Sequence, residues 1–196
     1  MVPTVSSAVH GHGRYTVEDW ESLPESNWPR VELINGEFAI TPPPTGQHQY
    51  ASDELRYILR DALRAADRDD LFVVSGIGIK ISFNQAFVPD LAILDIPPIG
   101  ASFDVHHLVL AVEIVSPGST KRDRLTKPAS YAAAGVPFYW RVEAAGAGAP
   151  EIVVHRLQGG AYVEEATLKP GTRTTLSTAT PVPVTLDPAD LPPLRR

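Results

Sequence analysis

Cysteine is absent from this sequence of 196 residues. Without cysteine the chain can form no disulfide, no thiolate nucleophile and no cysteine-ligated zinc or iron–sulfur site. Because nothing points to an oxidising compartment, we expect a cytoplasmic protein.

Long apolar segments are also absent. No stretch approaches the roughly 18 consecutive apolar residues that identify a membrane-spanning helix. The first residues, MVPTVSSAVHGHGRYT, lack the basic segment and the apolar segment of a signal peptide. We therefore expect a protein that neither enters a membrane nor is exported.

Basic residues are in the minority, with 17 Lys and Arg against 23 Asp and Glu and a formal charge of -6. An acidic balance argues mildly against nucleic acid as a partner, because phosphates favour basic surfaces. A local basic patch can still exist within an acidic chain.

The length and the pattern of apolar residues favour one domain of the α+β class. Residues 1–14 have no periodicity and are expected to form a flexible N-terminal arm, residues 15–187 the domain, and residues 188–196 a C-terminal tail. The expected elements are a short helix after Tyr15, a hairpin over 31–40, a helix over 47–68, strands over 71–82, 87–94 and 108–116, a helix over 122–134, a strand over 138–143, and a hairpin over 151–168.

The hairpin is predicted by Asn35-Gly36, a dipeptide that tolerates the two positive φ values of a type I′ turn. A two-residue loop pairs Glu32 with Ala39. Leu33 and its apolar neighbours then share one face, and Glu32 points to the other.

Two apolar strands each carry an acidic residue: Asp90 in FVPDLAIL and Glu113 in LVLAVEIVS. A buried carboxylate is costly unless it is paired, protonated or bound to a metal. The 13-residue connector from Asp95 to His107 lets the two strands pair in antiparallel fashion, so that both carboxylates can reach one point. Such a pair suits Mg²⁺, which takes a few carboxylate oxygens and keeps waters. Alternatively, each carboxylate lies at a strand end or pairs with a buried arginine.

A basic cluster follows Glu113. Within residues 120–127, four basic residues face one acidic residue, a local charge of +3 that leaves -9 for the rest of the chain. On a helix, Lys127 lies one turn after Asp123 and on the same side as Tyr131. A lysine beside a metal site can stabilise charge on a phosphate or position water. The alternative is a solvated helix N-terminus. The basic residues are Lys121, Arg122, Arg124 and Lys127.

The ordered motifs resemble the Uma-type putative endonuclease family, a branch of the restriction-endonuclease-like PD-(D/E)XK superfamily, from about Tyr15 to at least Tyr162. The resemblance implies a core of helix, three strands, helix and strand. It also implies that Asp90 and Glu113 bind metal and that Glu32 is a further acidic member of the site. The matching motifs are YTVEDWESLP, VELINGEF, His48, VPDLAIL, LAVEIVSPGS, Asp123, Lys127, Tyr131 and GVPFYW.

One position departs from the superfamily pattern. Val115 stands two residues after Glu113, where the usual motif has lysine. In the family that the chain resembles, the amine comes from the following helix, which here means Lys127.

The sequence therefore predicts a Mg²⁺-dependent endonuclease acting on DNA, with Mn²⁺ as a possible substitute. Asp90 and Glu113 would hold the metal, Glu32 a second metal or a water, and Lys127 would act at the scissile phosphate. A homodimer would allow both DNA strands to be reached. The alternatives are an inactive nucleic-acid-binding or protein-interaction module with the same fold, and an enzyme acting on another phosphoester. The residues expected to contact nucleic acid are Lys121, Arg122 and Arg124.

Overall fold

The computed structural model of the protein describes residues 14–23, 30–116, 118–146 and 148–194. The N-terminal arm predicted over residues 1–14 lies outside the described residues except for Arg14.

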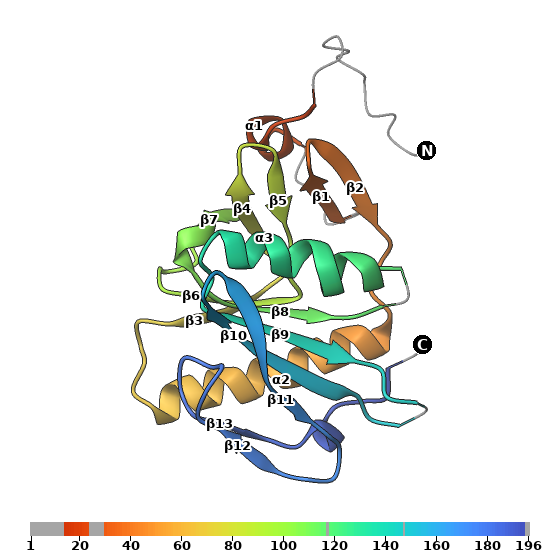
Figure 1. The fold of residues 1–196 in the computed structure, drawn as a ribbon, viewed down its shortest axis with the longest axis vertical. Coiled ribbons are helices and arrows are strands. Elements are labelled where there is room, and N and C mark those ends of the chain that lie inside the picture. Colours follow the sequence, from red (N-terminus) through yellow and green to blue (C-terminus); the bar gives the residue numbers. More distant parts are fainter. Residues whose placement is uncertain (1–13, 24–29, 117, 147, 195–196) are drawn as a thin grey trace.

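Two sheets make up most of the molecule (Figure 1). The larger sheet has six strands in the order β11-β10-β9-β8-β6-β3, and the smaller has five in the order β2-β1-β5-β4-β7. The larger sheet contains β3 (Phe72–Ser75), β6 (Leu91–Leu94), β8 (Leu108–Ile114), β9 (Phe138–Glu143), β10 (Glu151–Gln158) and β11 (Ala161–Leu168). The smaller contains β1 (Arg30–Ile34), β2 (Glu37–Thr41), β4 (Gly78–Ser82), β5 (Gln85–Phe87) and β7 (Ser102–Asp104).

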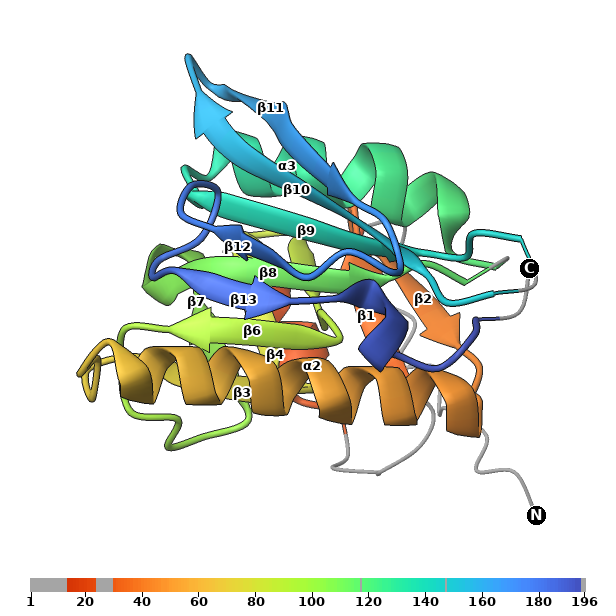
Figure 2. The ribbon, with the colours of Figure 1, turned by 90° about the horizontal axis from the view of Figure 1, so that it is seen from below.

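Helices cover both faces of the larger sheet. Helix α2 (Gly46–Ala65) lies along one face, as Figure 2 shows, while α3 (Lys127–Ala133) and the smaller sheet pack on the other. The remaining elements are α1 (Val17–Glu21), the 3-10 turns η1 (Val105–His107) and η3 (Pro188–Asp190), the π-helical turn η2 (Arg122–Thr126), and the pair β12 (Thr174–Leu176) and β13 (Val184–Leu186).

The central order is α2, β3, β6, β8, α3, β9, which confirms the predicted helix, three strands, helix and strand. Strands β6 and β8 are antiparallel, with Leu91 opposite Val112, and β8 and β9 are parallel. Continuing the first register by one residue places Asp90 across from Glu113. The pairing expected from the long connector is therefore present.

Two predicted strands are each divided in the structure. The strand expected over 71–82 is interrupted at Gly76, which has a φ of +63°. Glycine adopts such a positive φ readily. The two halves of the expected strand, β3 and β4, belong to different sheets. The strand expected over 87–94 is also wrong as one element, because β5 ends at Phe87 and β6 begins at Leu91. Asp90 therefore lies where the chain passes from the smaller sheet to the larger one, and not within a strand.

The hairpin of β1 and β2 has the predicted register, with Glu32 opposite Ala39. Asn35 and Gly36 have φ values of 52° and 78°, as the two-residue turn requires. Leu33 pairs with Ala86 of β5 and is buried, whereas Glu32 is buried on the opposite face of the strand. The turn thus determines which side of the smaller sheet receives a carboxylate.

The main core lies between α2 and the larger sheet. Leu55, Leu59 and Leu63 recur at four-residue intervals and are all buried there, as the apolar periodicity predicts. Leu191 and Leu194, in the segment predicted to be a C-terminal tail, are buried in the same core. Within the part of the chain that the structure describes, no helix has the length and apolar character needed to cross a membrane.

Truncating Leu59 tests this packing. Because Leu59 is 1% exposed, we expect Leu59→Ala to lower the free energy of unfolding by about 2–5 kcal/mol. Arg64→Ala, on the exposed side of the same helix, should change it by less than about 0.5 kcal/mol. Urea denaturation followed by circular dichroism measures both, and equal effects would contradict the assignment of the buried face.

Candidate active site

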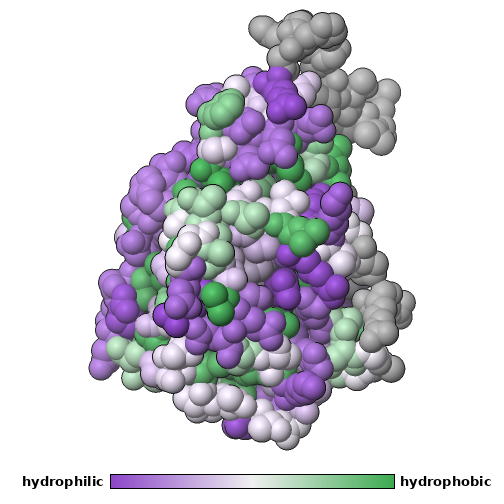
Figure 3. Space-filling view, viewed as in Figure 1, coloured by the Kyte–Doolittle hydropathy of each residue, from purple (hydrophilic) through white to green (hydrophobic). Residues whose placement is uncertain are grey.

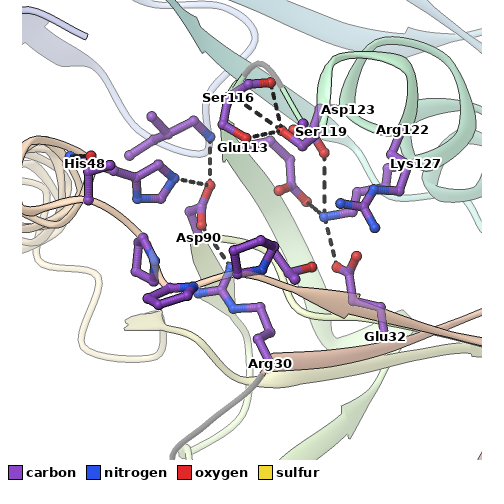
Figure 4. Close-up of a pocket in the computed structure, with 17 residues that line it drawn as sticks. Arg30, Glu32, His48, Asp90, Glu113, Ser116, Ser119, Arg122, Asp123 and Lys127 are labelled. Carbon is purple, nitrogen blue, oxygen red and sulfur yellow. Dashed lines mark hydrogen bonds and ion pairs between the residues drawn. The ribbon is translucent and has the colours of Figure 1, made fainter. Parts of the chain in front are cut away.

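A cavity of about 220 Å³ opens where β1, β8, the start of α2 and the start of η2 meet. Figure 4 shows acidic and basic side chains from all four elements pointing into it. The charged and histidine side chains that line it are Arg30, Glu32, His48, Asp90, Glu113, Arg122, Asp123 and Lys127.

Asp90 is held by three donors. The Arg30 guanidinium lies 2.9 Å from one carboxylate oxygen, and the Ile114 backbone N–H donates to the other at 2.7 Å. His48 Nε2 lies 3.2 Å from this second oxygen. Because the donors come from β1, β8 and α2, the carboxylate is fixed relative to both sheets.

These contacts keep Asp90 ionised. Burial alone would raise its pKa, but the hydrogen bond from His48 and the charges of His48 and Arg30, together with the Ile114 N–H, lower the pKa to about 2. Burial and the charge of Arg30 lower the pKa of His48, but the hydrogen bond to Asp90 and the charge of Asp90 raise this pKa above its usual value.

A second cluster surrounds the Lys127 ammonium group. Its nitrogen lies 2.8 Å from Glu32, 2.9 Å from Glu113 and 3.6 Å from Asp123. The Lys127 side chain is only 5% exposed, so this helix face points toward the interior. One buried cation is shared by carboxylates from β1, β8 and η2.

Local structure explains how Lys127 reaches this point. Strand alternation places Glu113 on the α3 side of the larger sheet, while Val112 and Ile114 face α2. The helical spacing of Asp123 and Lys127 places both on the side of η2 and α3 that faces the sheet. The Tyr139 hydroxyl donates to the Asp123 carbonyl oxygen at 2.5 Å, which ties the π-helical turn η2 to β9.

The cluster holds more negative charge than its single amine can balance. Burial, with the neighbouring carboxylates, raises the pKa of Glu113 well above its usual value in spite of Lys127. Burial also raises the pKa of Asp123, against the opposing effects of Lys127 and a hydrogen bond from Ser119. The surrounding carboxylates hold the pKa of Lys127 well above its usual value, although burial acts in the other direction. A proton or a further cation would relieve this imbalance.

The donor set fits a magnesium ion in its chemistry. Asp90 and Glu113 offer carboxylate oxygens beside one cavity, and Mg²⁺ needs only one or two carboxylates because it keeps several waters. Asp123 Oδ1 is buried without a hydrogen-bond partner among the described residues. In the described ranges, no three acidic or histidine side chains are already arranged around a metal position.

The structure brings the four predicted catalytic residues together. Glu32, Asp90, Glu113 and Lys127 all line the cavity. Glu32 is the partner of Lys127, and its Oε1 also accepts the Val88 N–H at 2.9 Å.

The predicted nucleic-acid contacts are divided between two places. Arg122 lines the cavity. Lys121 and Arg124 line a shallow depression beside it, together with the exposed Leu125, and Arg124 forms an ion pair with Glu143.

Sequence reasoning assigned no role to Arg30, His48 or Asp123 at the site. Asp123 had a usable signal, because its four-residue spacing from Lys127 places both on one helix face. Arg30 had none, since its partner Asp90 is 60 residues away. His48 was part of the family resemblance only.

Comparison with known proteins concerns the family and the fold. The sequence profile of the family Uma2, described as "Putative restriction endonuclease", matches residues 17–189. The fold is similar to the crystal structure of a "putative nuclease belonging to DUF820" from Anabaena variabilis ATCC 29413, with a TM-score of 0.70 and 17% sequence identity. The match covers 89% of this chain and 96% of the other. No curated protein matches the sequence.

The lowered pKa of Asp90 predicts how its removal affects stability. Its folded pKa of about 2 lies below the ordinary 3.8, so the charged form stabilises the fold above pH 3.8, and this contribution is lost as the pH falls toward 2. We expect Asp90→Asn to lower the free energy of unfolding by about 2 kcal/mol at pH 7 and by less at pH 3. Urea denaturation at both pH values measures the difference, and a difference that grows on acidification would contradict the assignment.

Glu113 should behave in the opposite way. A raised folded pKa means that the folded state binds the proton more tightly, so this contribution to stability is present below pH 4.5 and is lost as the pH rises through the folded pKa. Without a divalent cation, Glu113→Gln should therefore gain stability relative to the wild type between pH 5 and pH 8. Thermal unfolding in EDTA across this range tests the prediction, with Asp95→Asn, an exposed carboxylate, as control.

Proposed function

The chain belongs to the family described as putative restriction endonucleases, Uma2, and from this premise we propose that it is a Mg²⁺-dependent nuclease that hydrolyses phosphodiester bonds in DNA. The observation that carries the proposal is the sharing of one buried lysine by three buried carboxylates, beside a fourth carboxylate, Asp90, in the same cavity. Such a concentration of buried charge is costly for a purely structural site. Strongly perturbed titratable groups gathered in a cavity favour a functional site.

Asp90 and Glu113 are the residues proposed to hold the metal. When bound there, Mg²⁺ would supply an activated water and neutralise negative charge on the phosphate. Asp90 is suited to this because its pKa of about 2 keeps it charged at any physiological pH. A cation bound at Glu113 would offset the excess negative charge of the neighbouring carboxylates.

Lys127 is proposed to act at the scissile phosphate. An ammonium group has three N–H donors, and the contacts with Glu32 and Glu113 are within hydrogen-bond distance. The 3.6 Å contact with Asp123 is too long for a hydrogen bond. The third N–H donor of Lys127 can therefore turn to a water or a phosphate oxygen without breaking a hydrogen bond. Glu32 and Glu113 would hold the amine charged and aimed during the reaction.

Two arginines are suited to binding the phosphodiester. Arg30 is partly exposed, and its guanidinium already contacts Asp90 from the cavity wall. Arg122 lines the opposite side, where Figure 4 shows it beside Lys127. Guanidinium groups favour phosphate oxygens because their N–H donors match the oxygens in geometry as well as charge.

An inactive DNA-binding module with the same fold is the second candidate. It is favoured by Val115, which stands where the superfamily pattern has lysine, and by the close association of Lys127 with carboxylates. This candidate predicts neither metal binding nor cleavage, so the two tests below separate it from the nuclease.

Cleavage is tested on single-stranded and plasmid DNA with Mg²⁺, with Mn²⁺ and with EDTA. We expect metal-dependent cleavage that falls about 100-fold or more in Asp90→Asn, Glu113→Gln and Lys127→Met, because each removes a group that contacts the metal or the developing charge. Equal activity in the wild type and all three variants would indicate a contaminant or a different site.

The matched controls are Asp95→Asn and Lys169→Met, which remove exposed charges of the same kinds outside the cavity. Both should retain wild-type activity. A loss in the controls as large as in the site variants would point to a general charge effect.

Metal binding is tested without catalysis. If Asp90 and Glu113 hold the ion, millimolar Mg²⁺ should raise the thermal unfolding temperature of the wild type, because a ligand of the folded state stabilises it by mass action. The shift should disappear in Asp90→Asn and remain in Asp95→Asn. An unchanged temperature in the wild type would favour the inactive module.

A further inference from the structure

The groups proposed to act on the phosphate all lie below the molecular surface. Glu32 and Glu113 are each 2% exposed, Lys127 4% and Asp90 5%. A phosphodiester must therefore enter the cavity for these groups to reach it.

The cavity has room for only a small part of a nucleic acid. Its volume of about 220 Å³ is below the roughly 300–1,000 Å³ of typical ligand pockets. This accommodates a phosphate and neighbouring sugar atoms, but not a base pair. A phosphate of an intact double helix is attached to a stiff rod, with a persistence length of about 150 base pairs, and such a rod cannot bend locally into a small cavity without deformation.

The cavity walls are not built to open easily. One wall consists of Pro42, Pro43 and Pro44, which connect β2 to α2. Consecutive prolines have fixed φ angles and form stiff extended segments. The opposite wall includes Gly118 and Ser119, just before η2.

A second surface feature continues from the cavity. Gly118 borders both the cavity and the shallow depression that contains Lys121, Arg124 and Leu125. Figure 3 shows strongly hydrophilic residues with hydrophobic surface beside them at the η2 end of α3. Leu125 is 63% exposed. Lys121, and Arg124 where it is not occupied by Glu143, can contact the phosphates of a single strand, and Leu125 can contact the face of an unpaired base. A duplex hides the faces of its bases.

We infer that the substrate is an unpaired segment of a DNA strand, which passes the proline wall into the cavity and continues over Lys121, Arg124 and Leu125. This inference rests on the proposed nuclease function and specifies its substrate class. A site that cuts one strand needs no second copy of the chain to complete its reaction.

The first experiment compares two covalently closed substrates of the same length and sequence: a single-stranded circle and a relaxed double-stranded circle. Neither has ends, so the comparison isolates strand pairing. With Mg²⁺ or Mn²⁺, the single-stranded circle should be cut at least about tenfold faster, because the duplex must first be opened locally. Equal rates, or faster cutting of the duplex, would overturn the inference and leave the nuclease function intact.

If neither circle is cut, the proposed nuclease function fails, and binding then decides the inference about the strand. Fluorescence anisotropy of labelled 20-nucleotide single-stranded and duplex DNA in EDTA at low salt provides this measurement. Tighter binding of the single strand by about fivefold or more supports the inference. Equal binding, or tighter binding of the duplex, overturns it.

Substitution of Leu125 tests the proposed path. Leu125→Ala should weaken binding of the single strand about three- to tenfold and leave duplex binding unchanged, since only unpaired bases offer an apolar face. Ile99→Ala, which removes a side chain that is 88% exposed in the loop between β6 and β7, is the matched control and should change neither. The proposed path is wrong if Leu125→Ala weakens single-strand and duplex binding equally. It is also wrong if Leu125→Ala weakens neither.

Discussion

The ammonium group of Lys127, buried among three carboxylates, is the interaction on which the site depends. Its partners come from β1, β8 and η2, so a single charge joins the smaller sheet, the larger sheet and the turn that starts α3. If the amine were absent, Glu32, Glu113 and Asp123 would face one another in the interior, where unpaired carboxylates are strongly disfavoured. The amine therefore keeps the carboxylates close enough for joint chemistry.

Asp90 differs from this cluster because it is surrounded by hydrogen-bond donors and positive charge, and not by other carboxylates. It accepts from Arg30, His48 and the Ile114 N–H, and these donors lower its pKa to about 2, whereas burial and like charge raise the pKa of Glu113. Two carboxyls from paired positions on adjacent segments thus differ in their affinity for protons. A site that combines a carboxylate of low pKa with a carboxyl of raised pKa is suited to binding a cation next to a substrate. The fold places both carboxyls where the two sheets meet.

Stability and activity make opposing demands at this junction. Most of the molecule is stabilised by apolar packing between α2 and the larger sheet, and between that sheet and α3. The charged cluster interrupts the second of these layers. Tyr131 illustrates the cost: it is fully buried, its hydroxyl has no hydrogen-bond partner among the described residues, and nearby carboxylates together with burial raise its pKa well above the usual value. Local stability is reduced where chemistry is proposed to occur.

Local sequence determined the hairpin at Asn35-Gly36 and the buried stripe of α2, because each follows from a short-range period or turn preference. The connector length also allowed β6 to pair with β8, and the helical spacing indicated that Lys127 shares a face with Asp123. The acidic residues were recognisable because a charge within an apolar run is costly wherever the run is buried. Tertiary structure alone decided that β3 and β4 enter different sheets and that Arg30 neutralises Asp90. Neither result has a local signal. The apolar pattern of a strand does not indicate which other strands will pair with it. An ion pair between residues 60 positions apart forms only when the chain has folded.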